Sequence, residues 1–308
     1  MSLPTLRQLH YLTAVAELKH FGRAAEKCFV TQSTLSAGIQ DLEHILGVVL
    51  LERTNRKVLV TEIGKQLVER AQHILSLSAD LVDLAQSESN PKTGRIRIGV
   101  IPSISPFLLP KALPIIRQQL PQLALELIED QSERLLTQLR AGEIDVAILA
   151  LPFDVGDLEQ SIFAQESFWV ALPKHHPLAK SSSLHAEQLP RDDLLLLSEG
   201  HCLREHALSA CQLPTTTHRT SMQGTSLYTL IEMVAGGLGI TLIPEMAIDS
   251  DMVSHADICT RPLVTKGKNT ARELGLIWRS SYQRISTIEQ LAKIFASSLT
   301  APGHSERA

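Results

Sequence analysis

Two cysteines nine residues apart, Cys202 and Cys211, are the side chains of this chain best placed to do chemistry. The segment 203–210 has the composition of a helix, so Cys202 is expected at or near a helix N-terminus. The positive end of a helix and nearby cations, here His201 and Arg204, favour the thiolate, which is the reactive form of cysteine. The sequence therefore predicts a reactive thiol at position 202.

Nine residues of helix would separate the two cysteines by about 13 Å, at about 1.5 Å of rise per residue. A disulfide needs Cα atoms within about 7 Å of each other, so Cys202 and Cys211 cannot pair unless the helix unwinds. That geometry is typical of a redox switch. The residues alone leave an alternative open, in which one cysteine caps a helix, the other fills a core, and both are inert buried thiols.

Length and composition bound the class of protein. The chain has 308 residues, 44% of them hydrophobic, which is enough for two or three domains with sizeable cores. It has no apolar run near the ~20 residues that span a membrane, and Met1–His10 lacks the features of a signal peptide. We therefore expect a cytoplasmic protein whose four cysteines are thiols. The net charge of −4 gives no global sign of nucleic-acid binding, and no motif indicates a metal or another cofactor.

The first 46 residues predict three helices, at 6–15, 22–28 and 32–46. A tight turn before the third helix gives a helix-turn-helix pattern, in which the second helix of the motif presents its N-terminal residues to base edges in the major groove. An ordinary three-helix bundle with a polar surface remains an alternative. The candidate base-contacting residues share short hydrogen-bonding groups and are Thr31, Gln32, Ser33, Thr34 and Ser36.

Two apolar runs around a basic tip follow at 51–61 and predict a β-hairpin wing. Three cations in this segment, Arg53, Arg56 and Lys57, are placed to meet DNA phosphates. Residues 1–65 contain eight Lys and Arg against six Asp and Glu, so the electrostatic argument for DNA binding is local and modest.

Residues 62–86 predict one long helix, without proline and with a single glycine. Apolar positions recur in alternating steps of four and three, with Arg70 as the one polar position, which is the pattern of a helix that pairs with a second helix. A lone amphipathic helix packed on its own domain is the weaker alternative. The candidate dimer seam consists of Ile63, Leu67, Ile74, Leu77, Leu81 and Leu84.

From Gly94 onward, after a stretch of linker composition, predicted strands alternate with predicted helices. Such alternation indicates α/β sheets that bind ligands at strand ends. Strands are expected at 95–101, 123–128, 144–150, 167–172, 193–197, 240–243 and 274–279, and helices at 107–120, 132–141, 203–210, 226–234 and 285–298.

Four segments of the first third resemble LysR-type transcriptional regulators, namely Phe21–Glu26, Thr31–Ser36, Leu42–Glu43 and Leu50–Arg53. The resemblance implies a protein that is not an enzyme and that binds double-stranded operator DNA as a homo-oligomer, expected to be a dimer of dimers, and acts on RNA polymerase. No membrane is implied as a partner.

The same resemblance implies a division into domains. A winged helix-turn-helix is expected at 1–61, and a dimerising linker helix with a hinge at 62–91. The rest is expected to be an α/β regulatory domain of two subdomains, similar to periplasmic binding proteins. That domain would span 92–308, with subdomain I at about 92–165 and 269–308 and subdomain II at about 166–268.

The segment Gly200–Glu205, together with a second cysteine nine residues after Cys202, resembles the peroxide-sensing members of that family. The resemblance implies that Cys202 is oxidised by hydrogen peroxide to a sulfenic acid and that Cys211 resolves it to a disulfide, which remodels the domain and changes DNA binding and the transcription of antioxidant genes. Residues expected to support the peroxide site are His201, Arg204, Glu205, Ser103, Ser132 and Arg272.

The sequence departs from those relatives at Ser103 and Ser132, where threonines are expected. The hydroxyl is retained with greater rotamer freedom. Two alternatives remain open: a LysR-type regulator of a small metabolite with incidental cysteines, and, in another class, a thiol peroxidase. Replacement of both Cys202 and Cys211 by serine would leave the response to inducer intact in the first alternative. Sustained peroxide consumption with a thiol reductant would favour the second.

Overall fold

The chain folds into two compact units. The first comprises Met1–Glu88 and Arg140–Glu143, and the second Ser89–Leu139 and Ile144–Ala308. Within the part of the chain that is described, no helix is both long and apolar enough to cross a membrane. The computed structural model describes residues 3–53, 58–87, 93–211, 213, 223–264 and 271–300.

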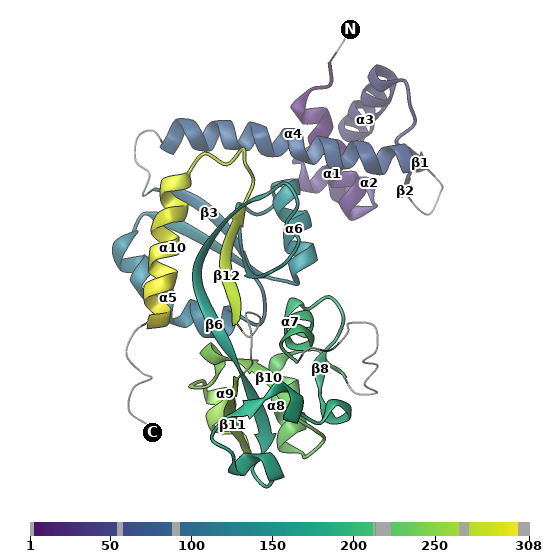
Figure 1. The fold of residues 1–308 in the computed structure, drawn as a ribbon. Coiled ribbons are helices and arrows are strands. Elements are labelled where there is room, and N and C mark those ends of the chain that lie inside the picture. Colours follow the sequence, from purple (N-terminus) through teal and green to yellow (C-terminus); the bar gives the residue numbers. More distant parts are fainter. Residues whose placement is uncertain are drawn as a thin grey trace. The chain divides into compact units, whose positions relative to one another are not determined.

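The first unit begins with three helices, α1 Leu6–Leu18, α2 Phe21–Lys27 and α3 Gln32–Leu46 (Figure 1). A polar side chain caps each N-terminus, because Thr5, His20 and Thr31 accept hydrogen bonds from backbone amides in the first turns. The apolar faces of the three helices meet in one buried core, which includes Leu12, Val15, Leu35, Ile39 and Leu42. The predicted helix-turn-helix is confirmed.

The predicted hairpin is present as strands β1 Leu51–Arg53 and β2 Val58–Val60, which pair antiparallel. Its base is fastened to α3 because the Glu43 carboxylate accepts hydrogen bonds from the backbone amides of Leu50, at 2.7 Å, and Leu51, at 3.2 Å. The single helix α4 Glu62–Ser87 follows, close to the predicted bounds.

The second unit is built on a sheet of eight strands with the order β4-β3-β5-β12-β6-β11-β7, and β10 also pairs with β6. Strand β3 is parallel to β4 and β5, whereas β12, β10 and β11 are antiparallel to β6. The strands are β3 Gly94–Val100, β4 Leu123–Glu129, β5 Val146–Leu151, β6 Glu159–Pro173, β7 Leu184–His185, β10 Thr241–Pro244, β11 Ile258–Val264 and β12 Ala271–Trp278.

The long strand β6 joins two subdomains. Its first part, up to Ser167, pairs with β12, and its second part, from Phe168, pairs with β10 and β11. Figure 1 shows β6 passing from the region of β12 to the region of β10. The expected crossing of the chain near Glu166 falls next to this exchange of partners, whereas the expected return near Lys268 lies outside the described residues.

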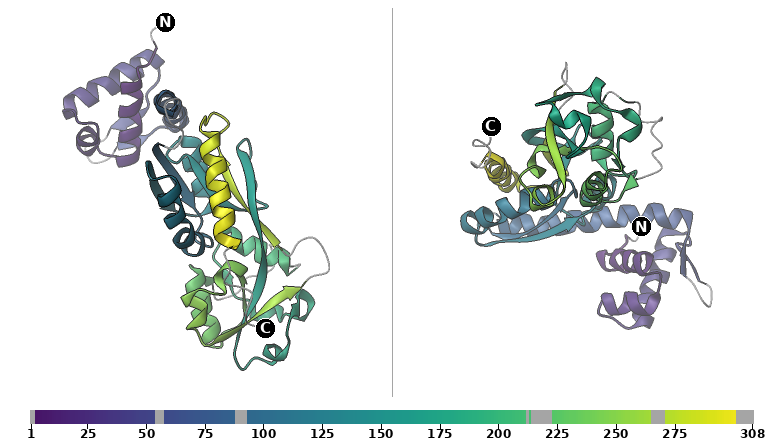
Figure 2. Two further views of the ribbon diagram at one scale, coloured as in Figure 1. Left: turned by 90° about the vertical axis from the view of Figure 1, so that its left-hand side faces the viewer. Right: turned by 90° about the horizontal axis from the view of Figure 1, so that it is seen from below.

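Helices cover the sheet and complete the core. Helix α10 lies beside α5 against the sheet, as Figures 1 and 2 show. The buried apolar cluster of this unit extends through both subdomains, from Ile98 to Ile243 and Leu276. The helices are α5 Ser105–Gln119, α6 Ser132–Ala141, α7 Cys202–Ala210, α8 Leu227–Ala235, α9 Asp251–Ser254 and α10 Ile285–Thr300, with short 3₁₀ turns at Pro177–Lys180, Ala186–Gln188, Arg191–Asp193 and Glu245–Ala247.

One predicted strand is much shorter than expected. The strand expected at 193–197 contributes only β8 Leu196–Leu197, which pairs with β9 Gln223–Gly224 in a separate two-stranded sheet. Upstream of it, Leu194 makes a single bridge to Ile240. Leu194–Leu197 are all buried in the core, so their hydrophobicity reports burial and overstated how much of the segment belongs to a β-ladder.

Candidate redox site

Cys202 is the first residue of α7, as the sequence predicts, and its side chain is buried with only 4% exposed. The chain enters the helix through Gly200, whose φ of +91° favours glycine. A Cβ atom at this position would lie 2.8 Å from Oε1 of Gln131, so glycine also leaves room for the side-chain amide of Gln131. Cys202 and Cys211 are both free thiols.

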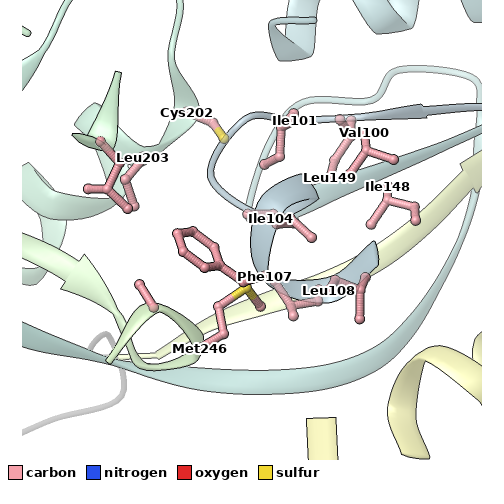
Figure 3. Packing of buried hydrophobic residues seen from close by; sticks show 14 of the residues in the cluster. Val100, Ile101, Ile104, Phe107, Leu108, Ile148, Leu149, Cys202, Leu203 and Met246 are labelled. Atoms are coloured by element: carbon pink, nitrogen blue, oxygen red, sulfur yellow. The ribbon is translucent and has the colours of Figure 1, made fainter. Parts of the chain in front are cut away.

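A small pocket opens beside Cys202 and has room for about one water-sized molecule. Figure 3 shows Cys202 at the border of the buried apolar cluster, near the loop after β3 that carries Ile101. Three segments that are distant in sequence build the walls, namely the loop after β3, the start of α6 and the start of α7. The lining residues are Ile101, Pro102, Ser103, Gln131, Ser132, His201, Cys202 and Leu203.

Burial raises the pKa of the Cys202 thiol, and this is the largest effect on it. Three groups oppose that effect by favouring the thiolate: the Ser132 hydroxyl as a donor to charged sulfur, the charge of Arg272 and the backbone amide of Ala150. The Ser132 hydroxyl is itself buried and has no hydrogen-bond partner of ordinary geometry among the described residues. It is therefore free to donate to sulfur when negative charge develops there.

Arg272 is the charged centre of the site and is only 1% exposed. Its Nε donates to Oε1 of Glu166 at 2.6 Å, its Nη1 donates to Oγ of Ser103 at 2.8 Å, and its Nη2 donates to the Ser103 carbonyl at 3.0 Å. Arg272 and Glu166 are directly paired across β12 and β6, at the crossing between subdomains. A guanidinium held by a carboxylate on one side and a pocket residue on the other brings positive charge to the cysteine with little freedom to move.

His201 lines the pocket but is not the cation that the sequence suggested. Burial lowers the pKa of His201, so the ring is neutral at pH 7. The ring does not cap α7; its Nε2 lies 3.2 Å from Nε2 of Gln131. The interaction joins the start of α7 to the start of α6.

Arg204 and Glu205 lie outside the pocket lining. Arg204 is buried and its Nη1 donates to the Leu197 carbonyl at 3.1 Å, which ties the first turn of α7 to the end of β8. Glu205 is exposed, and its charge raises the pKa of Cys202 rather than lowering it. The expected stabilisation of a thiolate by His201 and Arg204 is thus replaced in the structure by Arg272 and Ser132.

Cys211 is the C-cap residue of α7 and is buried among apolar residues. Burial raises the pKa of this thiol to about 12, against a small opposing effect of Arg191. The two cysteines stand at opposite ends of a continuous helix, as predicted, and a direct S–S bond is incompatible with that helix.

Three residues in or near the site were not singled out from the sequence. Gln131 immediately precedes Ser132, and its position in the pocket could have been inferred from that neighbour. Glu166 gives no clear signal, because it lies between Gln165 and Ser167 in a strand that also carries Glu159. His206 stands one helical turn after Cys202.

The candidate DNA-contacting residues gather at the N-terminus of α3. Thr31, Gln32, Ser33 and Thr34 are exposed, and Ser36 is half-buried. Thr31 Oγ1 lies 2.9 Å from Oγ of Ser33 and 2.8 Å from Oγ1 of Thr34. On the wing, Arg56 and Lys57 lie outside the described residues, and only the backbone of Arg53 is described.

The candidate dimer seam forms an exposed apolar stripe on α4. Ile63, Ile74, Leu77 and Leu81 are 40–68% exposed, which is unusual for such large apolar side chains. Leu67 instead packs against the core of the first unit. The side chain of Leu84 lies outside the described residues.

Comparison with protein families assigns both parts of the chain. Residues 6–78 match the bacterial regulatory helix-turn-helix protein, lysR family, and residues 89–300 match the LysR substrate binding domain. The chain belongs to the LysR family of transcription regulators.

Similar proteins narrow the comparison. The HTH-type transcriptional regulator EstR of Acinetobacter baylyi is 43% identical over 282 residues, 91% of this chain and 92% of EstR. The DNA-binding transcriptional dual regulator OxyR of Escherichia coli is 38% identical over 291 residues, 94% of this chain and 93% of that protein.

Solved structures of OxyR proteins also match this chain over nearly its whole length. A full-length OxyR variant from Pseudomonas aeruginosa matches with a TM-score of 0.77 and 36% identity, covering 96% of this chain and 98% of that one. An OxyR mutant from Corynebacterium glutamicum with bound H2O2 matches with a TM-score of 0.64 and 34% identity, covering 97% and 94%.

Proposed function

We propose that this protein is a peroxide-responsive transcription regulator in which Cys202 is oxidised by hydrogen peroxide and Cys211 resolves the product to a disulfide. The observation that carries the proposal is the pocket at Cys202. It suits a molecule of about the size of water, and its walls carry the Cys202 thiol and the buried hydroxyl of Ser132. Behind the lining residue Ser103, the Arg272 guanidinium is fixed by a hydrogen bond to the Ser103 hydroxyl. Relatives named as hydrogen peroxide-inducible genes activators, at 37–43% identity, support it.

The first chemical step is attack of the Cys202 thiolate on one oxygen of peroxide. An S–O bond forms, the O–O bond breaks, and the leaving hydroxide takes up a proton to become water. Arg272 and Ser132 are the groups that stabilise charge at sulfur. Ser103, held by Arg272, presents a second hydroxyl to the pocket and orients the oxidant.

The second step needs a change of conformation. Cys211 sulfur attacks the sulfenic sulfur of Cys202, an S–S bond forms, the S–O bond breaks, and hydroxide leaves and is protonated to water. Because α7 holds the thiols apart, the helix unwinds before the disulfide closes. Remodelling of α7 is the event by which oxidation alters the regulatory domain.

The output of the switch is binding to double-stranded DNA in the cytoplasm. Thr31, Gln32, Ser33, Thr34 and Ser36 are proposed to contact base edges, and Arg53, Arg56 and Lys57 to contact phosphates. We further propose that RNA polymerase is recruited at the promoters of antioxidant genes, and that the division into domains is as the family resemblance implies.

The exposed stripe on α4 supports a homodimer, which a second contact would assemble into a dimer of dimers. Replacement of Leu81 by glutamate places a charge in the stripe and is expected to weaken association at least tenfold in analytical ultracentrifugation. Gln66→Glu adds the same charge at an exposed polar position of α4 and serves as the control. Equal association of both variants would exclude the stripe as the dimer seam.

A second candidate is a LysR regulator of a different signal, which the similarity to EstR favours. A promoter reporter in a strain that lacks other peroxide regulators separates the two. We expect wild-type protein to change reporter output within minutes of a low peroxide dose, and Cys202→Ser to give no change. Equal responses of the two proteins would reject the peroxide proposal in favour of the second candidate.

A further inference from the structure

The middle of α7 carries a buried histidine that the proposed chemistry does not use. His206 is 7% exposed and stands one helical turn after Cys202, within the segment that must unwind before the two cysteines can meet. It does not line the pocket. Its position within α7 therefore calls for a role other than contact with the oxidant.

Within the part of the chain that the structure describes, the hydrogen bond of the His206 ring goes to a residue outside α7. Nε2 lies 3.0 Å from the carbonyl oxygen of Pro152, the residue that follows β5 in the other subdomain. Since a carbonyl only accepts, Nε2 carries the proton and donates, and Nδ1 is then a bare acceptor. Nδ1 is buried and has no hydrogen-bond partner among the described residues.

The two ring nitrogens have opposite effects on the stability of α7. The Nε2 bond fixes the centre of α7 to the β5 strand end, while the unpartnered Nδ1 is a buried polar atom that water would satisfy once the helix opened. Burial together with the charge of Arg272 lowers the pKa of His206, so the neutral, singly donating ring is the form present. The hydrogen bond to Pro152 therefore stabilises the folded helix, whereas Nδ1 becomes hydrated only after α7 has unwound.

We propose that His206 is a positioning residue that holds α7 in its reduced, helical conformation through Pro152, and that breaking this hydrogen bond controls the rate at which the sulfenic acid of Cys202 is resolved by Cys211. The inference rests on the proposed function. It assigns the two steps to different groups, with Ser132 and Arg272 acting on the oxidation and His206 acting on the resolution.

Two variants of matched shape test the hydrogen bond. His206→Gln keeps a donor, since the amide nitrogen takes the place of Nε2, whereas His206→Met has nearly the same length and volume without one. Rapid quenching with a sulfenic-acid trap gives the oxidation rate in a Cys211→Ser background, and mass analysis of the disulfide gives the resolution rate in the full chain.

We expect the resolution rate of His206→Met to be about three- to tenfold higher than that of His206→Gln, as loss of one buried hydrogen bond implies. The oxidation rate should be equal in the two variants. Equal resolution rates would overturn the proposal, and so would a proportional change in both steps, which a general loosening of the fold would produce.

Amide hydrogen exchange of 203–211 in the reduced protein provides an independent readout. His206→Met should exchange about three- to tenfold faster than His206→Gln in this segment alone. Faster exchange without faster resolution would overturn the proposal. If wild-type protein formed no sulfenic acid, the proposed function would fail, and the exchange comparison would still decide whether His206 fastens α7.

Discussion

At the N-terminal end of α7, Cys202 meets a pocket, a hydroxyl and a fixed guanidinium, whereas at the C-terminal end Cys211 meets apolar side chains. Burial raises the pKa of both thiols. Among the described residues, three groups, Ser132, Arg272 and Ala150, act to lower the pKa of Cys202, whereas Arg191 alone acts to lower that of Cys211. The difference shows that the surroundings of the two cysteines, and not the thiols themselves, make their reactivities differ. One end of the helix is arranged to react, and the other is kept unreactive until the helix opens.

The largest expected effect comes from replacing each cysteine by serine, because the two variants should stop the oxidation at different steps. Cys202→Ser should form neither sulfenic acid nor disulfide at near-stoichiometric peroxide. Cys211→Ser should stop at a sulfenic acid on Cys202, visible as a mass gain of one oxygen that a dimedone-type trap converts to an adduct. Rapid oxidation of Cys211 in the Cys202→Ser protein would show that the C-terminal thiol is not inert and would contradict the account.

The pH dependence of Cys202 oxidation should reveal a thiol rather than a standing thiolate. Because burial raises the pKa of Cys202 above 9.0, the thiolate fraction and the initial rate should rise about tenfold per pH unit between pH 6 and pH 8. Stopped-flow measurement of peroxide loss in the Cys211→Ser background isolates this step. A rate that is flat over the range would mean that Arg272 and Ser132 outweigh burial.

Ser132→Ala should slow oxidation of Cys202 about tenfold, since it removes a hydrogen bond to developing charge. Its stability in urea should be unchanged or slightly higher, because the buried Ser132 hydroxyl has no hydrogen-bond partner of ordinary geometry to lose in the reduced protein. Ser209→Ala, an exposed serine of α7, is the control. A wild-type oxidation rate in Ser132→Ala would remove the hydroxyl from the site.

The smallest expected effect concerns stability at high pH under reducing conditions. The folded-state pKa of Cys211 is about 12 against 9.0 for the ordinary thiol, so the folded state retains this proton more strongly. The associated stability is fully present below pH 9 and is lost as the pH rises toward 12, by about 1.4 kcal/mol per unit. Denaturation of wild type and Cys211→Ala at pH 8, 9 and 10 should therefore converge, and parallel curves would contradict the buried setting of this thiol.

Much of the first unit could be predicted because its signals are local. The cap at Thr31, the apolar spacing of Leu35, Ile39 and Leu42, and the glycine after Leu46 together fix the bounds of α3 within a few residues of sequence. The same holds for α4, which contains no proline and a single glycine, Gly64, in its first turn.

The electrostatics of the site could not be predicted in the same way. Arg272 and Glu166 are 106 residues apart and meet only because β12 and β6 pair. His201 and Arg204 stand beside Cys202 in sequence, yet burial keeps the first neutral and a carbonyl of β8 engages the second. Proximity along the chain was a poor guide because burial depends on elements that pack from elsewhere.

The most direct measurement of the central claim is the thiol state of the reduced, full-length protein after a brief, near-stoichiometric dose of hydrogen peroxide. Rapid alkylation, intact mass and peptide mapping report every cysteine at once. The account predicts fast loss of two hydrogens, mapped to a bond between Cys202 and Cys211, with Cys28 and Cys259 still reduced. Unmodified thiols, or slow oxidation scattered over all four cysteines, would contradict it.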